Sequence, residues 1–296
     1  MLLQLIKAIR PINLLVITLT FYVLHILGIN SREFIPGSYQ ISLISLKVLT
    51  ISTLLIAAAG YLINDYYDKE IDIINKAHKR NPLSKQALLT GYIILNITAL
   101  ILSFTFALSN AVLWVFPISI LLLWLYSVKL KGLPFIGNLS VALLSATVPF
   151  IYLSIQDLAH SYTSSVYLII TFSFLAFFST LARELVKDIE DIEGDKAQGL
   201  KTIPIFWGIK TAKFWTIFFL LCTLFILGLL IAGVDYFDFT ILSLVIAAIF
   251  GVTPLLLSVA KSYQATEKKH FKQAGNYIKI SMFGFLLFIY IHAITI

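Results

Sequence analysis

The chain has 296 residues, of which 59% are hydrophobic and only 12% are charged, and its mean hydropathy is +0.93. A typical soluble domain is about 45–50% apolar and about 25% charged. The composition therefore excludes a soluble globular enzyme and a disordered chain, and the single cysteine excludes a disulfide scaffold. It predicts a polytopic helical membrane protein, in which the net charge of +7 reflects loops that face anionic lipid rather than nucleic-acid binding.

A membrane-spanning helix needs about 20 mostly apolar residues. We expect an all-α fold with one domain over residues 1–296, a bundle of nine transmembrane helices around a central cavity. In chain order, the predicted spans are residues 11–29, 41–63, 88–108, 111–126, 135–155, 163–183, 212–233, 237–259 and 277–296. Pro117, Pro149 and Pro254 lie inside these spans, where kinks are expected.

The segments that connect the spans alternate in charge. All of the 22 Lys and Arg residues except Arg32 and Lys47 fall on the side that holds the N-terminus and the loops near 64–87, 127–134, 184–211 and 260–276. The positive-inside rule makes this side cytoplasmic. We therefore expect a multi-pass protein of the cell (inner) membrane, with the N-terminus and the active site on the cytoplasmic side and the C-terminus outside.

Two clusters of carboxylates lie on this basic side, over residues 64–72 and 188–195. Both contain the pattern D-x-x-D-x-x-x-D, formed by Asp65, Asp68 and Asp72 in the first cluster and by Asp188, Asp191 and Asp195 in the second. Offsets of 0, 3 and 7 lie on one face of a helix. Because each cluster continues the end of a predicted span, we expect both to point into one cavity at the cytoplasmic membrane surface.

Three carboxylates on one helix face repel each other, and a divalent cation would compensate for that repulsion. Oxygen ligands favour Mg²⁺ over Zn²⁺ or copper, and Mg²⁺ is commonly shared between one or two carboxylates and substrate phosphates. Two such clusters are suited to clamping a diphosphate. A metal transporter is the alternative, but it would place carboxylates near the bilayer midplane, and the predicted spans are almost free of acids.

The first cluster resembles the N-D-x-x-D-x-x-x-D signature of the UbiA-type intramembrane prenyltransferase superfamily, and the second cluster resembles its second signature, D-x-x-D-x-x-x-D. The resemblance implies a Mg²⁺-dependent enzyme that transfers a polyprenyl group from an isoprenyl diphosphate through an allylic carbocation. It implies Mg²⁺ ligands and catalytic carboxylates in both clusters: Asn64, Asp65 and Asp68 for the first ion, Asp191 and Asp195 for the second, and Asp72 and Asp188 in support. The carbocation must be kept from water, so we expect the prenyl chain to lie in a dry tunnel.

Other segments resemble the family's cationic diphosphate contacts. Tyr126 occupies the place of the tyrosine in a Y-x-x-x-K pattern, but the lysines that follow stand at offsets three and five, as Lys129 and Lys131. We favour Lys131. Arg80 is the candidate in a segment similar to N-K-x-x-R-P, and Lys201 in one similar to G-x-x-T-x-P. For each of these residues, the alternative is a juxtamembrane or topological role.

Arg10 and Asn13 open the first span in a pattern that also resembles the family, and we expect them on the acceptor side of the cavity. The segments NDYYDKEIDIINK, YSVKLKGLPFIGN and KDIEDIEGDKAQGLKTIPI most resemble the geranylgeranylglycerol-phosphate geranylgeranyltransferase branch. That branch implies geranylgeranyl diphosphate as donor and geranylgeranylglyceryl phosphate as acceptor. The alternatives are an aromatic acceptor such as 4-hydroxybenzoate in quinone biosynthesis and, less favoured, a non-enzymatic transporter or a non-catalytic relative.

Overall fold

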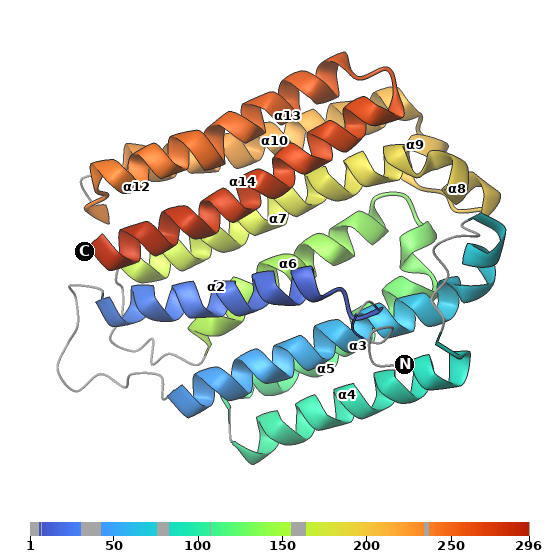
Figure 1. Cartoon of the computed structure of the whole chain (residues 1–296), viewed down its shortest axis with the longest axis horizontal. Helices are drawn as coiled ribbons and strands as arrows, with labels where there is room; N and C mark the ends of the chain where they lie inside the picture. The colour runs from blue at the N-terminus through green and yellow to red at the C-terminus, as the bar shows by residue number, and fades with distance from the viewer. Residues whose placement is uncertain are drawn as a thin grey trace.

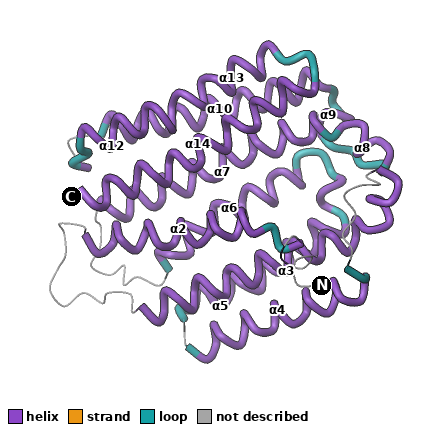
Figure 2. The backbone as a smooth tube through the Cα atoms, in the orientation of Figure 1, coloured by secondary structure: helices purple, strands orange, loops and turns teal. Residues whose placement is uncertain are grey.

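The computed structural model describes residues 6, 8–30, 43–75, 83–106, 108–154, 164–233 and 237–295. In this part of the chain all regular secondary structure is helical (Figure 2). Nine helical segments among these residues are long and apolar enough to cross a membrane. The prediction of an all-α, multi-pass membrane protein is therefore confirmed, whereas the central cavity stays a prediction.

The helices follow the predicted order (Figure 1). The first six spans are α2 (Pro11–Asn30), α3 (Leu43–Asn75), α4 (Lys85–Thr105), α5 (Asn110–Val128), α6 (Ile136–Leu153) and α7 (Ser164–Glu190). The seventh is α10 (Ile209–Ala232), the eighth consists of α12 (Ile241–Ile246), the π-helical η3 (Ala247–Val252) and α13 (Thr253–Gln264), and the ninth is α14 (Lys268–Thr295). Three short helices lie between spans: η1 (Leu130–Gly132), α8 (Ile192–Ala197) and α9 (Ile203–Phe206).

The second, sixth and ninth spans extend furthest beyond their predicted bounds at the basic end. The second was expected to end at residue 63, but α3 continues to Asn75; the sixth was expected to end at residue 183, but α7 continues to Glu190. The last was expected to begin at residue 277, but α14 begins at Lys268. An apolar run marks the part of a helix that lipid surrounds, whereas the backbone hydrogen bonds continue into the charged residues that follow.

The helices α2, α3, α5, α6, α7 and α14 form a ring in which each packs against the next, and α14 closes it on α2. Helix α4 packs on α3 outside this ring, and α10 and α13 pack against α7 and α14 on the other side (Figure 1). Helix α7 is the most buried of the spans. The end of α3, the end of α7 and α8 all lie at one edge of the bundle, opposite the C-terminus. This arrangement brings both carboxylate clusters to the same end.

The surface that faces away from the bundle is apolar. Large side chains such as Phe104, Trp114 and Ile241 are 76%, 72% and 82% exposed. Exposing such a surface to water costs roughly 25 cal/mol per Å² of apolar area, whereas contact with lipid tails avoids this cost. Many serine and threonine hydroxyls inside the helices donate to the carbonyl four residues earlier, as Thr216 does to Ala212 at 2.8 Å. Their hydroxyl groups therefore have partners without water.

Among the glycines of the described residues, Gly284 of α14 makes the closest approach to another helix, the eighth span. Pro254 has no N–H to donate, and the helix widens into the π-helical η3 just before it. The carbonyl of Gly251 accepts a hydrogen bond from the Ser281 hydroxyl of α14 at 2.9 Å. A Cβ atom on Gly284 would lie only 2.1 Å from the Phe250 carbonyl oxygen. Glycine is thus required there by close backbone approach.

Candidate active site

The first carboxylate cluster lies on the last turns of α3, a single continuous helix as predicted. The Asn64 amide donates to Asp68 at 2.8 Å, and the Asp68 carboxylate also pairs with the Lys131 ammonium. Asp65 lies 3.8 Å from the Arg10 guanidinium. Each of these carboxylates therefore faces a cation brought from a different part of the chain, as expected of an anionic site that binds cations and phosphates.

The side chains of two predicted site residues lie outside the described part of the structure. Asp72 belongs to α3, but its side chain is outside the described part of the structure. Arg80, the predicted diphosphate contact, lies in the segment 76–82, outside the described residues. Their roles stay predictions.

A tight turn after α5 presents Lys131 to the first cluster. Helix α5 ends at Val128 with Lys129 as its C-cap, and η1 follows directly. The turn continues into α6 so closely that a Cβ on Gly137 would lie 2.9 Å from the Leu130 carbonyl oxygen. Lys131 is 15% exposed and paired with Asp68, whereas Lys129 is exposed. Of the two lysines the sequence offered, the structure brings Lys131 to the carboxylates.

The second cluster is divided between two helices, so the expectation of a single helix face does not hold for it. Asp188 lies on α7, Asp191 is the N-cap residue of α8, and Asp195 lies on α8. The backbone bends at Asp191, where φ is −100° and ψ is 10°. The Asp191 carboxylate makes no capping hydrogen bond. The bend re-aims the last two carboxylates relative to α7, which the regular spacing of the motif could not indicate.

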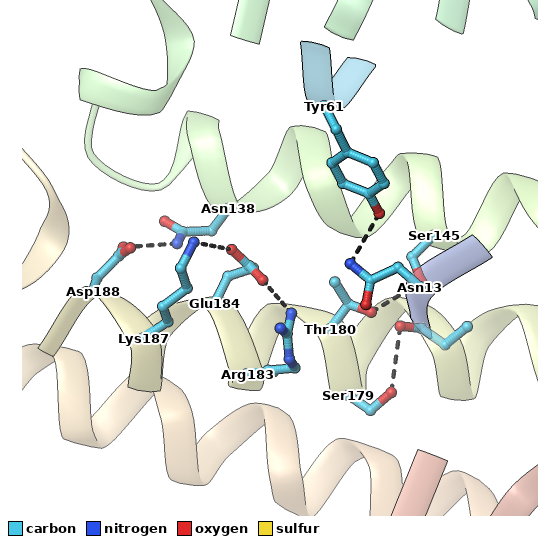
Figure 3. Close-up of polar contacts among 11 residues, drawn as sticks. Asn13, Tyr61, Asn138, Ser145, Ser179, Thr180, Arg183, Glu184, Lys187 and Asp188 are labelled. Carbon is cyan, nitrogen blue, oxygen red and sulfur yellow. Dashed lines mark hydrogen bonds and ion pairs between the residues drawn. The ribbon is translucent and has the colours of Figure 1, made fainter. Parts of the chain in front are cut away.

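Neighbouring polar side chains hold this second cluster. The Asn138 amide of α6 donates to Asp188 at 2.8 Å (Figure 3), and the Thr202 hydroxyl donates to Asp195 at 3.3 Å. Not every acid of the cluster faces the site. The Glu190 carboxylate lies against α14, where a Cβ on Gly275 would be only 3.3 Å from its Oε1.

The loop that carries Lys201 joins the second cluster to the Lys131 turn. Its backbone N–H donates to the Gly132 carbonyl at 3.0 Å, and a Cβ on Gly132 would lie 3.1 Å from the Leu200 side chain. Gly199 permits the reversal after α8 because it adopts a φ of +68°. Lys201 thus lies beside the predicted site through its backbone, although its own side chain is exposed.

Tyr126 stands on the last turn of α5, directly before the turn that contacts both clusters. Lys131 of this turn pairs with Asp68 of the first cluster. The Gly132 carbonyl accepts a hydrogen bond from the Lys201 N–H, in the loop that follows the second cluster. The two clusters are therefore connected through this turn.

Arg10, directly before α2, and Asn13, in its first turn, both contact Tyr61 of α3. The Asn13 amide donates to the Tyr61 hydroxyl at 3.0 Å (Figure 3), and the Arg10 guanidinium lies over the Tyr61 ring, 4.8 Å from its centre. Arg10 adopts a φ of +52°, a left-handed conformation that is unfavourable for a non-glycine residue. The surrounding contacts outweigh this cost and hold the guanidinium between Tyr61 and Asp65.

Several contributing residues are not among the predicted site residues. Tyr61 stands within an apolar span, and Asn138 stands at the start of the fifth span. Arg183, Glu184 and Lys187 form a further set of charges on α7: Arg183 and Glu184 are 2.6 Å apart, and Lys187 lies 3.9 Å from Glu184 (Figure 3). The signal that could have found them is their position, an Arg, a Glu and a Lys between the end of the sixth apolar run and the second aspartate motif.

The donor set fits magnesium chemically. Its side chains are carboxylates and an amide, the oxygen donors that Mg²⁺ prefers. Within the described residues, no three His, Cys, Asp or Glu side chains lie close enough to hold a metal ion by themselves. This is compatible with Mg²⁺, which takes one or two carboxylates and completes its shell with water and substrate phosphates. The clusters suit ions that arrive with a phosphorylated ligand.

The sequence profile of the UbiA prenyltransferase family matches residues 34–286 of this chain. The chain belongs to this family. This UbiA prenyltransferase is similar to a digeranylgeranylglyceryl phosphate synthase of Thermococcus sibiricus, with 34% identity over 289 residues and 95% of each chain covered. A relative of the same name from Methanosphaera stadtmanae is 32% identical over 280 residues, with 94% of each chain covered.

Solved structures show the same fold. One, from a study of digeranylgeranylglyceryl phosphate synthase in membranes, has a TM-score of 0.72 and 25% identity, and the match covers 100% of this chain and 99% of that one. A UbiA homologue from Archaeoglobus fulgidus, bound to DMAPP and Mg²⁺, has a TM-score of 0.59 and 16% identity, and the match covers 99% of this chain and 100% of that one. The UbiA architecture is therefore shared over the whole chain.

Proposed function

We propose that this UbiA prenyltransferase transfers a geranylgeranyl group from geranylgeranyl diphosphate to geranylgeranylglyceryl phosphate, with Mg²⁺ as its cofactor. The relatives that are similar over nearly the full chain carry the name digeranylgeranylglyceryl phosphate synthase. A product with two such chains on one glyceryl phosphate forms when an acceptor that has one chain receives a second. The observation that carries the proposal is that the turn after α5 contacts both clusters, through Lys131 at Asp68 and through the Gly132 carbonyl at the Lys201 loop.

The donor diphosphate is proposed to bind among the carboxylates and the cations beside them. Asn64, Asp65 and Asp68 would hold Mg²⁺ on α3, and Asp191 and Asp195 would hold it on the α7–α8 side, with Asp72 and Asp188 in support. Magnesium supplies charge stabilisation for the departing diphosphate. Lys131, which already lies at Asp68, would contact a diphosphate oxygen, and Arg80 and Lys201 are proposed as further contacts from their loops.

In the reaction the bond between the allylic carbon and the diphosphate oxygen breaks, and the diphosphate leaves with the electron pair. The resulting allylic cation is attacked by the acceptor hydroxyl, which forms a new carbon–oxygen bond. The hydroxyl proton passes to a basic oxygen of the diphosphate that has just departed. Lys131 would stabilise the negative charge as it develops on the leaving group, which is where fixed charges accelerate a reaction most.

The membrane supplies the remaining requirement, the exclusion of water from the cation. The prenyl chain is proposed to extend from the carboxylates into the apolar interior of the bundle, and aromatic faces can stabilise a nearby cation. The acceptor, itself a lipid, would enter from the bilayer. The ends of α3 and α7 lie at one edge of the bundle (Figure 1), and the loops that follow them carry most of the Lys and Arg residues together with the loops near 127–134 and 260–276. We therefore propose that this edge is cytoplasmic and that the C-terminus lies outside.

A panel of acceptors tests the proposal. Purified protein in lipid vesicles is given geranylgeranyl diphosphate, Mg²⁺ and one acceptor at a time: geranylgeranylglyceryl phosphate, 4-hydroxybenzoate or dihydroxynaphthoate. The ether of glyceryl phosphate is the expected product, released with one diphosphate per transfer. Transfer to an aromatic acceptor alone would move the protein to quinone biosynthesis, and ion flux without any transfer would indicate a transporter.

A further inference from the structure

Arg183, Glu184 and Lys187 form a polar cluster on α7, on the membrane-interior side of the second carboxylate cluster. Glu184 is buried, with 6% of its surface exposed. Its two oxygens face two different cations, Oε1 lying 2.6 Å from Arg183 and Oε2 lying 3.9 Å from Lys187 (Figure 3). Ionisable groups within a span are costly and occur where they are paired or used. Here a single carboxylate positions two cations.

The cluster is positively charged. Arg183 and Lys187 share the single carboxylate of Glu184, so one of the two positive charges is not compensated within the cluster. The contact with Glu184 engages one of the five N–H donors of the Arg183 guanidinium. The Lys187 side chain is 51% exposed, although it points toward Asn138 and Glu184 rather than away from the bundle (Figure 3). Both cations therefore retain donors for a ligand in the interior.

We infer that Arg183 and Lys187 bind the phosphate monoester of the acceptor. This inference rests on the proposed function, because it concerns the second substrate of the same site. The donor diphosphate is already served by the carboxylates, Lys131 and the ions they hold. A phosphate monoester carries about −1.5 to −2 charges at pH 7, and the fork of a guanidinium matches phosphate oxygens.

The position of the cluster suits the chemistry of such an acceptor. Arg183 lies five residues before Asp188 on α7, a rise of about 7.5 Å along the helix, and Lys187 is the residue next to Asp188. In a glyceryl phosphate the free hydroxyl is on the carbon next to the one that carries the phosphate ester. A phosphate held one turn from the carboxylates would therefore place the hydroxyl beside the allylic carbon, where a separation of about 3–3.5 Å is needed for attack.

The same placement would give selectivity. An acceptor without a phosphate would leave Arg183 and Lys187 with only the Glu184 carboxylate between them, so the repulsion between the two cations would stay partly uncompensated. Recognition by groups that must be paired rejects analogues that lack the partner more strongly than apolar contacts do. The cluster would thus separate glyceryl phosphates from acceptors of similar shape but no charge.

A pair of acceptors that differ only in the phosphate tests the subsite: geranylgeranylglyceryl phosphate and geranylgeranylglycerol. The variant combines Arg183→Gln with Lys187→Gln, and Lys210→Gln, an exposed lysine at the same end, is the control. We expect the double variant to raise KM for the phosphorylated acceptor at least about tenfold. KM for geranylgeranyl diphosphate and KM for geranylgeranylglycerol should both change less than about twofold.

Two outcomes would overturn the subsite. One is a rise in KM for geranylgeranyl diphosphate as large as that for the acceptor, which would assign the cations to the donor. The other is an equal loss with both acceptors, which would indicate a structural role. Arg183→Lys keeps the charge and serves as the folding check: it should bind the phosphorylated acceptor more tightly than Arg183→Gln does.

Direct binding separates failure of this inference from failure of the proposed function. Without donor, wild-type protein in nanodiscs is titrated with each of the two lipids. Preference for the phosphorylated lipid in wild type, and its loss in the double variant, supports the subsite even if no transfer product forms. Equal binding of the two lipids by wild type contradicts the subsite even if transfer to geranylgeranylglyceryl phosphate occurs.

Discussion

Lys131 pairs with Asp68 although 63 positions separate them in the sequence. The lysine follows α5 in a tight turn, and the aspartate stands on the last part of α3. Their side chains are only 15% and 24% exposed, so the pair is screened less by solvent than an ordinary surface ion pair. The contact joins the first carboxylate cluster to the turn on which the Lys201 loop also rests.

The two lysines of this turn should therefore behave differently. We expect Lys131→Ala to raise KM for the prenyl diphosphate by about tenfold or more, because a charge-assisted hydrogen bond contributes about 1.5–3 kcal/mol. Lys129→Ala, which removes an exposed charge from the same turn, is the matched control and should change KM less than about twofold. Steady-state kinetics with varied donor measures both, and the reverse order of effects would assign the contact to Lys129.

Asn138 should act through Asp188. It donates to that carboxylate at 2.8 Å, so it fixes the orientation of a proposed supporting ligand. Loss of such an orienting partner typically costs about 10–100-fold in metal affinity or activity. We expect Asn138→Leu to raise the Mg²⁺ concentration needed for half-maximal turnover by about tenfold. Ser140→Ala on the same helix removes a hydroxyl that donates to the Ile136 carbonyl of that helix, and it should leave this Mg²⁺ concentration unchanged. An equal shift in both variants would argue against a role of Asn138 in orienting Asp188.

The sequence predicts much of this architecture because apolar runs and the aspartate motifs can each be recognised within a short stretch of the chain. Nine apolar runs predict the nine spans found in the described residues, and the first aspartate motif lies on a continuous helix as its spacing requires. The bend at Asp191 could not be foreseen, because the residues around it are compatible with a continuous helix. Tyr61 and Asn138 depend on which helices face each other, and that is decided by packing of the whole bundle.

The close backbone approach at Gly284 predicts that Gly284→Ala lowers the stability of the protein, whereas Gly228→Ala does not. A methyl group on Gly284 would overlap the Phe250 carbonyl in η3, and overpacking of this kind costs about 1–3 kcal/mol. Gly228 in α10 has no atom within 4 Å of the position a Cβ would take. Gly228→Ala should be neutral or stabilising, since alanine favours a helix over glycine by about 1 kcal/mol. Thermal unfolding in detergent compares the two, and equal Tm values would contradict the packing at η3.

The proposed orientation can be measured in intact cells. In a Cys222→Ser background, single cysteines are placed at Lys196, exposed near the carboxylates, and at Phe106, exposed at the opposite end between α4 and α5. A membrane-impermeant thiol reagent should label the cysteine at 106 in intact cells and the cysteine at 196 only after the membrane is opened. Labelling in the opposite pattern would invert the protein in the membrane.

The central claim is that the two carboxylate clusters form one site for prenyl transfer. The most direct measurement is the release of diphosphate and the formation of the two-chain glyceryl phosphate by purified wild type, Asp65→Ala and Asp191→Ala, with Asp238→Ala at the other end of the bundle as control. We predict equal amounts of diphosphate and ether from wild type and from the control, and loss of both products in each cluster variant with its thermal unfolding preserved. Near-wild-type turnover in Asp65→Ala or in Asp191→Ala would contradict a single site built from both clusters.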